Sequence, residues 1–144
     1  MEFTPFKPWH LKLFRPGKLF QHPYLPEEAR AALYRNVEGI TVLLDGEIVA
    51  IMGIALLWPG VGEVTLIPSD KFYQNKFTAT KITKKFIRLA LETFRLHRIQ
   101  ATALKDLPGH SRFLEFLGFQ LEGTLRGYGL KGEDFNMYSY GGPK

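Results

Sequence analysis

The stretch that decides the fold runs from Leu107 to Tyr140 and reads LPGHSRFLEFLGFQLEGTLRGYGLKGEDFNMYSY. Pro108 opens a short helix, because proline is well tolerated in a first helical turn. Gly118 ends that helix, since glycine adopts the left-handed conformation that stops a helix at little cost. The following Phe119 can lock the helix end into the core. The segment therefore predicts a helix of about ten residues, ended by glycine and anchored by an aromatic side chain.

Strands are predicted on both sides of this helix. Residues 119–128 and 135–140 flank the polar turn LKGED and predict a C-terminal β-hairpin. Upstream, Arg98 to Leu104 (RIQATAL) predicts a further strand. Before it, the longest helix is expected from about Thr78 to Leu96. Its apolar residues recur at steps of three and four, at Ile82, Phe86, Leu89, Ala90 and Phe94.

The first half of the chain predicts a strand, a short helix and an antiparallel meander. The strand is His10 to Arg15, and the helix begins at Pro26 and runs through ARAALYRN. Asp45-Gly46 is a strong two-residue hairpin signal. The meander strands are Gly39 to Leu44, Glu47 to Trp58 and Glu63 to Ile67. The whole order is β-α-β-β-β-α-β-α-β-β, an α/β fold with a mixed central sheet.

Composition indicates one domain over residues 1–144. The chain is 45% hydrophobic and 23% charged, which is ordinary for a single globular core. The absence of cysteine excludes disulfides and thiol chemistry. No secretory signal is recognisable, and the longest apolar run, Ile48 to Trp58, is too short to span a bilayer. We therefore expect a cytoplasmic protein without a membrane segment.

The formal charge of +5 favours an anionic partner without naming it. The long helix carries basic residues on its polar face, which we interpret as a solvated face rather than a nucleic-acid surface: Lys81, Lys84, Lys85, Arg88 and Arg95. His10, His22, His97 and His110 are widely separated and have no ligand spacing, so no metal site is expected.

The order of elements and the segment from Leu107 resemble the GNAT acyltransferase superfamily, especially its branch that modifies ribosomal proteins and protein N-termini. The family segment reads Asn-Pro-x-Ser, then a helix ending Glu-Lys-Leu-Gly-Phe, a Glu-Gly strand and a Gly-x-Asp hairpin. The matching positions here are Pro108, Glu115, Leu117, Gly118, Phe119, Glu122, Gly123, Arg126, Gly132 and Asp134. The resemblance implies a GNAT fold, with acetyl-coenzyme A as co-substrate and an amine as acceptor.

In the family, the cofactor site lies between the third meander strand and the long helix, in a loop reading Gln/Arg-x-x-Gly-x-Gly/Ala. Here the loop reads Gln74-Asn75-Lys76-Phe77-Thr78-Ala79, followed by Thr80. Backbone N–H groups at a helix N-terminus hold a pyrophosphate there. Phe77 replaces the first glycine, which leaves three alternatives: the phosphates sit farther out, depend more on Lys71, Lys76 and Lys81, or do not bind. The resemblance also implies backbone contacts at Leu66 and Ile67 and a role at the cofactor for His110.

Glu63 stands where several GNAT enzymes place the carboxylate that takes a proton from the substrate amine, directly or through water. A strand-end glutamate that faces solvent or pairs with a lysine is the alternative interpretation. Leu114 stands where many relatives carry the tyrosine that protonates the leaving thiolate. Tyr128 or Tyr138 would have to substitute, although a tyrosine in such a strand is more often a packing residue.

Two readings of the function stay open. The first is an acyl-coenzyme A-dependent N-acyltransferase, with a protein amine as the first expected acceptor. The second is a catalytically inactive GNAT-like structural or interaction protein, because both Phe77 and Leu114 depart from the family pattern. Small GNAT-like proteins with altered phosphate loops also occur in tailed bacteriophages, and the stretches WHLKLFRP and EVTLIPSDKF are similar to them. The oligomeric state is open in both readings.

Overall fold

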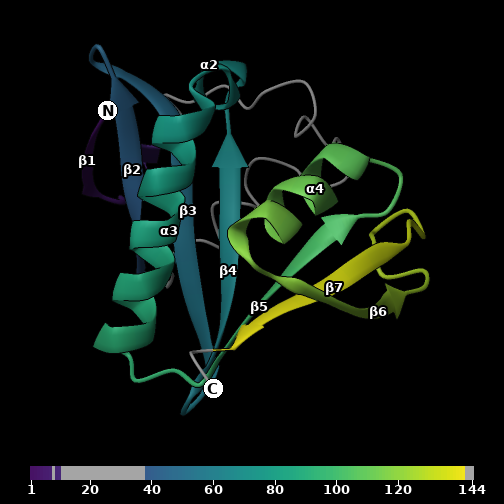
Figure 1. Cartoon of the computed structure of the whole chain (residues 1–144). Coiled ribbons are helices and arrows are strands. Elements are labelled where there is room, and N and C mark those ends of the chain that lie inside the picture. Colours follow the sequence, from purple (N-terminus) through teal and green to yellow (C-terminus); the bar gives the residue numbers. More distant parts are fainter. Residues whose placement is uncertain (8, 11–37, 142–144) are drawn as a thin grey trace. The chain divides into compact units, whose positions relative to one another are not determined.

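A computed structural model describes residues 1–7, 9–10 and 38–141. Seven strands form one mixed sheet in the order β1-β2-β3-β4-β5-β7-β6, accompanied by helices (Figure 1). The predicted mixed α/β architecture is therefore confirmed. The backbone divides into two compact units, which are residues 1–55 with 64–86 and residues 56–63 with 87–144. The prediction of one domain stays a prediction.

The first unit contains an antiparallel meander. β1 (Glu2–Pro5) pairs with β2 (Glu38–Leu44), and β2 pairs with β3 (Glu47–Trp58). Asp45 and Gly46 join β2 to β3 with positive φ angles of 51° and 78°, as a two-residue hairpin of this type requires. The hairpin predicted from Asp-Gly is thus confirmed.

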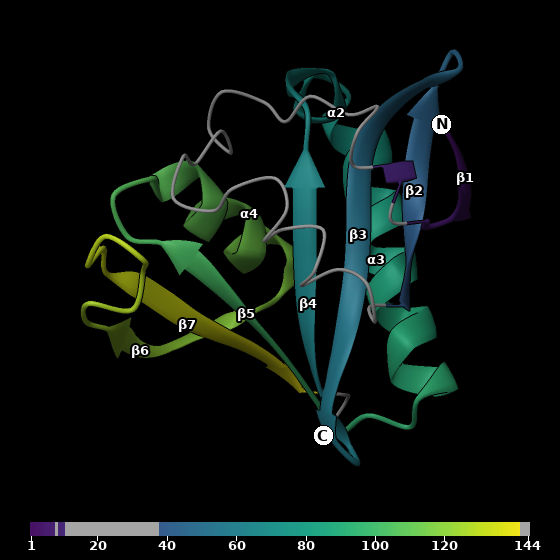
Figure 2. The ribbon, with the colours of Figure 1, turned by 180° about the vertical axis from the view of Figure 1, so that it is seen from behind.

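β4 (Val61–Pro68) leads into two consecutive helices, α2 (Asp70–Gln74) and α3 (Lys76–Thr93). The N–H of Ser69 donates to the carbonyl of Val49 at 2.7 Å, which fixes the end of β4 beside β3. Figure 1 shows α3 in front of β2 and β3, and Figure 2, seen from behind, shows the strands in front of the helix. One face of the meander is therefore covered by the start of α3.

The predicted N-terminal elements need correction. β1 lies at residues 2–5, where no strand was expected, and His10 lies in a turn in which its N–H donates to the carbonyl of Lys7 at 2.9 Å. His10 therefore does not begin a strand. The rest of the strand predicted to Arg15, and the helix predicted from Pro26, lie outside the described residues.

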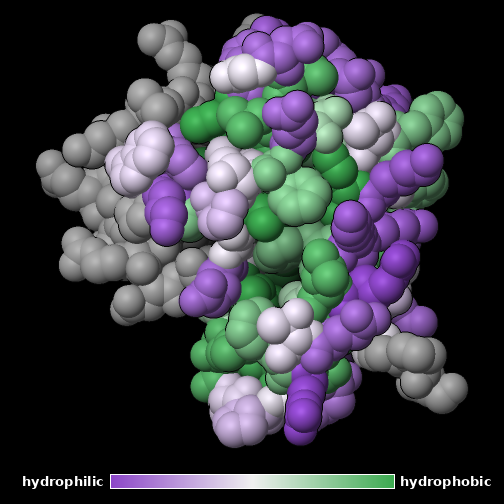
Figure 3. Space-filling view, turned by 90° about the vertical axis from the view of Figure 1, so that its left-hand side faces the viewer, coloured by the Kyte–Doolittle hydropathy of each residue, from purple (hydrophilic) through white to green (hydrophobic). Residues whose placement is uncertain are grey.

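The long helix is confirmed, with a shifted start and a different buried face. It begins at Lys76 instead of Thr78. Leu89, expected on the apolar face, is 46% exposed, whereas Thr83 is buried. Thr83 tolerates burial because its hydroxyl donates to the carbonyl of Ala79 at 2.8 Å. Basic side chains dominate the exposed face, and Figure 3 shows this face as a hydrophilic band.

The second unit contains the C-terminal ladder. β5 (Arg98–Leu104) pairs antiparallel with β7 (Phe135–Gly141), which also pairs with β6 (Gln120–Leu125). The first residues of β4, 61–63, pair parallel with residues 98–100 of β5. α4 (Pro108–Leu117) contacts β5 and β6. The predicted strand, short helix and terminal hairpin are therefore confirmed.

The end of α4 follows the predicted design. Gly118 has a φ of 103°, and the N–H of Phe119 donates to the carbonyl of Leu114 at 3.0 Å. This is the Schellman arrangement, in which a left-handed residue lets the chain reach back to unpaired helix carbonyls. Phe119 is 3% exposed and contacts the ring of Tyr140 with centroids 5.5 Å apart. The aromatic lock expected from the sequence is present.

Candidate functional site

The candidate cofactor loop forms the junction of α2 and α3. The side chain of Asn75 donates to the carbonyl of Lys71 at 3.0 Å, so it stabilises the end of α2. The carbonyl of Asn75 accepts the first hydrogen bond of α3, from the N–H of Ala79 at 2.9 Å. Among the described residues, the three N–H groups that precede Ala79 in α3 have no acceptor: Lys76, Phe77 and Thr78. Such groups carry the positive end of the helix dipole.

Phe77 adopts ordinary backbone geometry. In the part of the chain that the structure describes, only Asp45 and Arg95 have positive φ among residues other than glycine. The replacement of the family glycine therefore causes no backbone strain at position 77. The side chain is 88% exposed, so the ring is not packed against the rest of the molecule. What distinguishes this loop from the family pattern is the bulk of an exposed aromatic ring beside the helix end.

The charge around this helix end is positive. The first turn of α3 contains Lys76 and no acidic residue, and Lys76 and Lys81 are both exposed. Lys71, expected to help hold phosphates, instead forms an ion pair with Glu47 on β3, with both side chains more than half exposed. An exposed pair of this kind is weak. The free cations nearest to the first turn along the chain are thus Lys76 and Lys81.

The remaining residues of the predicted cofactor site divide between the two units. Leu66 and Ile67 lie half-buried on β4 in the same unit as residues 74–80. The partly buried side chain of Ile67 packs against the buried pair Phe6 and Ile51. Of the loop residues, Ala79 is buried at 1% exposure and Thr80 is half-buried, whereas Gln74 to Thr78 are exposed.

Glu63 and His110 belong to the second unit. His110 lies half-buried in the first turn of α4, where its N–H donates to the carbonyl of Leu107 at 3.2 Å. Glu63 is half-buried on β4, and its carboxylate accepts a hydrogen bond from Gln100 on β5 at 3.1 Å. Among the described residues, the partner of Glu63 is thus a neutral amide and not a lysine, and its role as a base stays a prediction.

A polar cluster that was not predicted from the sequence continues from Gln100. The Nε group of Arg98 donates to Gln100 Oε1 at 3.3 Å, and both terminal nitrogens of Arg98 bond the carboxylate of Glu122 at 2.7 and 2.8 Å. The hydroxyl of Ser139 donates to the same carboxylate at 2.8 Å. The alternation of polar and apolar residues in RIQATAL could have indicated that Arg98 and Gln100 share one face of a strand. Their partners on β4 and β6 could not be read from that alternation.

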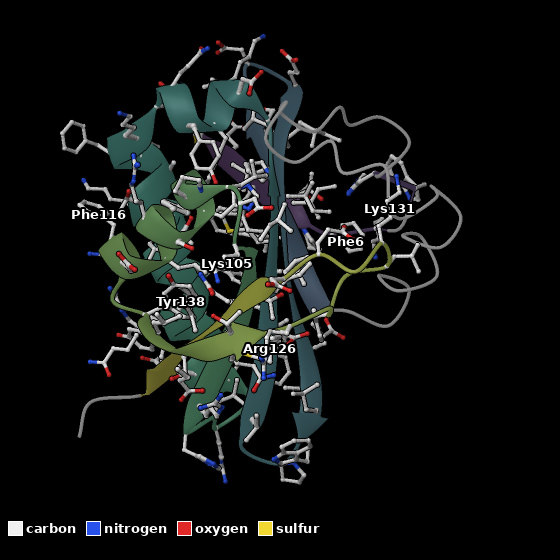
Figure 4. The ribbon with its side chains drawn as sticks, turned by 90° about the vertical axis from the view of Figure 1, so that its right-hand side faces the viewer. Phe6, Lys105, Phe116, Arg126, Lys131 and Tyr138 are labelled. Carbon is white, nitrogen blue, oxygen red and sulfur yellow. The ribbon has the colours of Figure 1, made fainter. Side chains whose placement is uncertain are left out.

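The two tyrosines considered as replacements for an acid on α4 lie in different environments. Tyr138 on β7 is 1% exposed, and its hydroxyl donates to Glu115 Oε1 at 3.1 Å (Figure 4). Burial raises the pKa of Tyr138. Tyr128 is 55% exposed, and its ring packs edge-on against Phe135. Tyr138 is therefore a packing residue, as the sequence favoured, and Leu114 itself is half-buried on α4.

Within the described residues, no group of three or more His, Asp or Glu side chains is arranged to hold a metal ion. None of the helices among these residues is both long enough and apolar enough to cross a membrane.

Comparisons with known proteins show which solved structures have a similar fold. Neither a protein-family model nor a curated protein sequence matches the chain significantly. Among solved structures, a ribosomal-protein-alanine N-acetyltransferase from Brucella melitensis matches with a TM-score of 0.74 and 13% identity, over 98% of this chain and 99% of that one. A variant of spermidine N-acetyltransferase from Vibrio cholerae matches with a TM-score of 0.73 and 14% identity, over 98% and 95%.

A GNAT-family acetyltransferase from Bacillus anthracis matches with a TM-score of 0.72 and 15% identity, over 96% of this chain and 93% of that one. These likenesses extend over nearly the whole of each chain, and they agree with the element order and with the α4 and hairpin signals of the sequence. The protein therefore has the fold of the GNAT acetyltransferase superfamily.

Proposed function

We propose that the protein is an N-acyltransferase that moves an acetyl group from acetyl-coenzyme A to an amine. The observation that carries this proposal is the backbone likeness to three N-acetyltransferases over 96–98% of the chain. Fold alone does not fix activity, so the chemistry of the residues has to agree with it. Two features of the described residues do agree.

The first feature is the start of α3. A pyrophosphate would suit this helix end for three reasons. Three backbone N–H groups have no acceptor among the described residues, the helix dipole is positive there, and Lys76 and Lys81 are exposed. The bound co-substrate would supply the activated acetyl thioester. We assign the first-turn amides to its phosphates and the β4 backbone at Leu66 and Ile67 to its remaining hydrogen bonds. Phe77 is compatible with this assignment because its exposed ring has room to turn aside.

The second feature is Glu63, which we assign as general base. An acceptor amine is an ammonium ion near neutral pH and has to lose a proton before its nitrogen attacks the thioester carbonyl. A half-buried carboxylate held by a neutral amide is able to take that proton. The thioester C–S bond then breaks as the new C–N bond forms, and coenzyme A leaves as a thiolate. The second proton, which the nitrogen loses as it becomes the amide, neutralises that thiolate. Within this proposal, a protein amine is the acceptor to test first.

A second candidate function is a GNAT-like interaction protein without catalytic activity, of the kind found in tailed bacteriophages. Two observations favour it. Phe77 projects almost fully into solvent beside the cofactor helix, and α4 has Leu114 where an acid would stand, while buried Tyr138 is engaged with Glu115. An exposed aromatic ring also suits a surface that contacts another macromolecule.

Calorimetric titration of acetyl-coenzyme A separates these two functions. We expect the natural protein to bind with a dissociation constant in the micromolar range, about −8 kcal/mol. Phe77→Ala and Phe77→Gly test the ring and the backbone separately, because φ at position 77 is already compatible with alanine. Phe116→Ala, at a phenylalanine that is 69% exposed on α4, is the matched control.

Equal binding by the natural protein and by all three variants would support the enzyme and justify a screen of amine acceptors with Glu63→Gln as the inactive control. Absence of binding in the natural protein, restored by both Phe77 variants, would favour the interaction protein with a blocked site. Binding restored by Phe77→Gly alone would mean that the loop needs backbone freedom that the present structure does not use. Absence of binding in every variant would rule out the acyltransferase.

A further inference from the structure

The carboxylate of Glu63 has a single described partner, and that partner lies directly opposite it. Glu63 and Gln100 are register partners in the parallel pairing of β4 with β5. The Nε2 group of Gln100 donates to Glu63 Oε1 at 3.1 Å. Among the described residues, no donor reaches the other carboxylate oxygen, Oε2. The two oxygens of Glu63 are therefore inequivalent.

The orientation of the Gln100 amide is dictated by Arg98. A guanidinium only donates hydrogen bonds, so the amide oxygen has to face Arg98 Nε, which lies 3.3 Å away. The amide NH₂ then has to face Glu63. Were the amide turned over, its NH₂ would meet the Arg98 N–H and its oxygen would meet the carboxylate, which gives two repulsive contacts. Gln100 thus presents a donor to Glu63.

Arg98 is itself fixed at its other end. The carboxylate of Glu122 on β6 binds both terminal nitrogens of the guanidinium, and this bidentate geometry is the most specific that arginine forms. Hydrogen bonds from Arg98 and then from Ser139 lower the pKa of Glu122 to about 2. Arg98 and Glu122 both stay ionised at neutral pH, so their opposite charges cancel within this cluster.

We propose that Gln100 is a positioning residue for the base Glu63. Gln100 occupies Oε1 and holds the side chain in one rotamer, so that Oε2 is the oxygen that takes the proton from the acceptor ammonium. The inference rests on the proposed function, because it assigns a role within that reaction. Arg98 and Glu122 act one step further away, by fixing the direction of the amide.

The test uses Gln100→Leu and Gln100→Glu in the full chain. The matched control is Thr102→Val, two residues further along the same face of β5 and also half-buried. The resonance of the carboxyl carbon of Glu63 is measured by ¹³C NMR at pH 7, which needs no catalytic activity. Initial rates with acetyl-coenzyme A and the amine acceptor then give kcat and KM.

We expect both Gln100→Leu and Gln100→Glu to shift the ¹³C resonance of the Glu63 carboxyl group. The first variant removes the amide donor, and the second places a like charge opposite the carboxylate. Gln100→Leu should lower kcat about tenfold with little change in the KM for acetyl-coenzyme A, because the base is misplaced. Thr102→Val should change none of these quantities.

A Glu63 carboxyl resonance that is the same in the natural protein and both Gln100 variants would overturn the inference. An equal loss of kcat in Gln100→Leu and Thr102→Val would also overturn it, because that pattern reports general damage to β5. Failure of the proposed function has a different signature. The natural protein then transfers no acyl group, while the NMR comparison still decides whether Gln100 holds Glu63.

Discussion

Replacement of Gly118 by alanine tests how the end of α4 is built. At φ 103° an added Cβ is strained whatever space surrounds it, and the built Cβ would lie 3.3 Å from Tyr140 Cε2. The left-handed backbone costs about 1 kcal/mol for a residue other than glycine. The Tyr140 ring packs against Phe119, so it has to move by a few tenths of an ångström, and mild overpacking of this kind costs about 1 kcal/mol. We expect Gly118→Ala to lower the free energy of unfolding by about 2 kcal/mol.

Gly132→Ala is the control that isolates the backbone contribution. Gly132 also has a positive φ, 84°, but a Cβ there would meet no atom within 4 Å. Gly132→Ala should therefore lower the free energy of unfolding by about 1 kcal/mol. Urea denaturation followed by circular dichroism measures both variants, and the melting temperature should fall by about 4 °C per kcal/mol. Equal destabilisation by the two variants would refute the contribution of Tyr140, and no destabilisation by either would refute the backbone argument.

Three further predictions concern other parts of the fold. Arg95 has a φ of 52° just after α3, where glycine is preferred, so Arg95→Gly should raise the free energy of unfolding by about 0.5 kcal/mol in urea denaturation. A Cβ on Gly39 would overlap the backbone carbonyl of Met52 on β3. Gly39→Ala should therefore lower the free energy of unfolding by about 3 kcal/mol or more. Near-native stability of this variant would contradict the β2–β3 register. Burial and then Lys7 lower the pKa of His10, so its contribution to stability is complete above the unfolded value of 6.5 and is lost as pH falls. The free energy of unfolding, measured from pH 7.5 to 5, should show this loss. The variant His10→Gln should lack this part of the pH dependence.

Local signals in the sequence determined much of the fold correctly. Asp45-Gly46 specifies a hairpin by itself, because both residues accept the positive φ angles of the turn. β3 and β5 have the bounds that their runs of Ile, Val, Leu and Ala predicted. Gly118 and Phe119 end α4 as expected, since a helix stop depends on only a few neighbouring residues.

Other features depend on segments that are far apart in the chain. β1 is too short and polar to show a strand pattern, and it is held in place by pairing with β2. The buried face of α3 includes Thr83 and excludes Leu89, because packing and the hydroxyl's bond to the helix backbone outweigh side-chain hydrophobicity there. Sequence periodicity gives the existence of an apolar face but leaves its phase uncertain by one residue.

The candidate site also combines features that were predicted from the sequence with features that depend on distant segments of the chain. Through its resemblance to a family, the sequence predicted a phosphate loop at residues 74–80 and a base at Glu63, and it raised the question of Phe77. Only the tertiary structure gave Phe77 an ordinary helical backbone, engaged Lys71 with Glu47, and placed Gln100 opposite Glu63. A parallel strand pairing joins residues 37 positions apart, and hydrogen bonds across it depend on register that no local pattern encodes. The sequence therefore determined which residues are candidates for the site, whereas the fold decided which partners orient their side chains, because those partners come from distant strands.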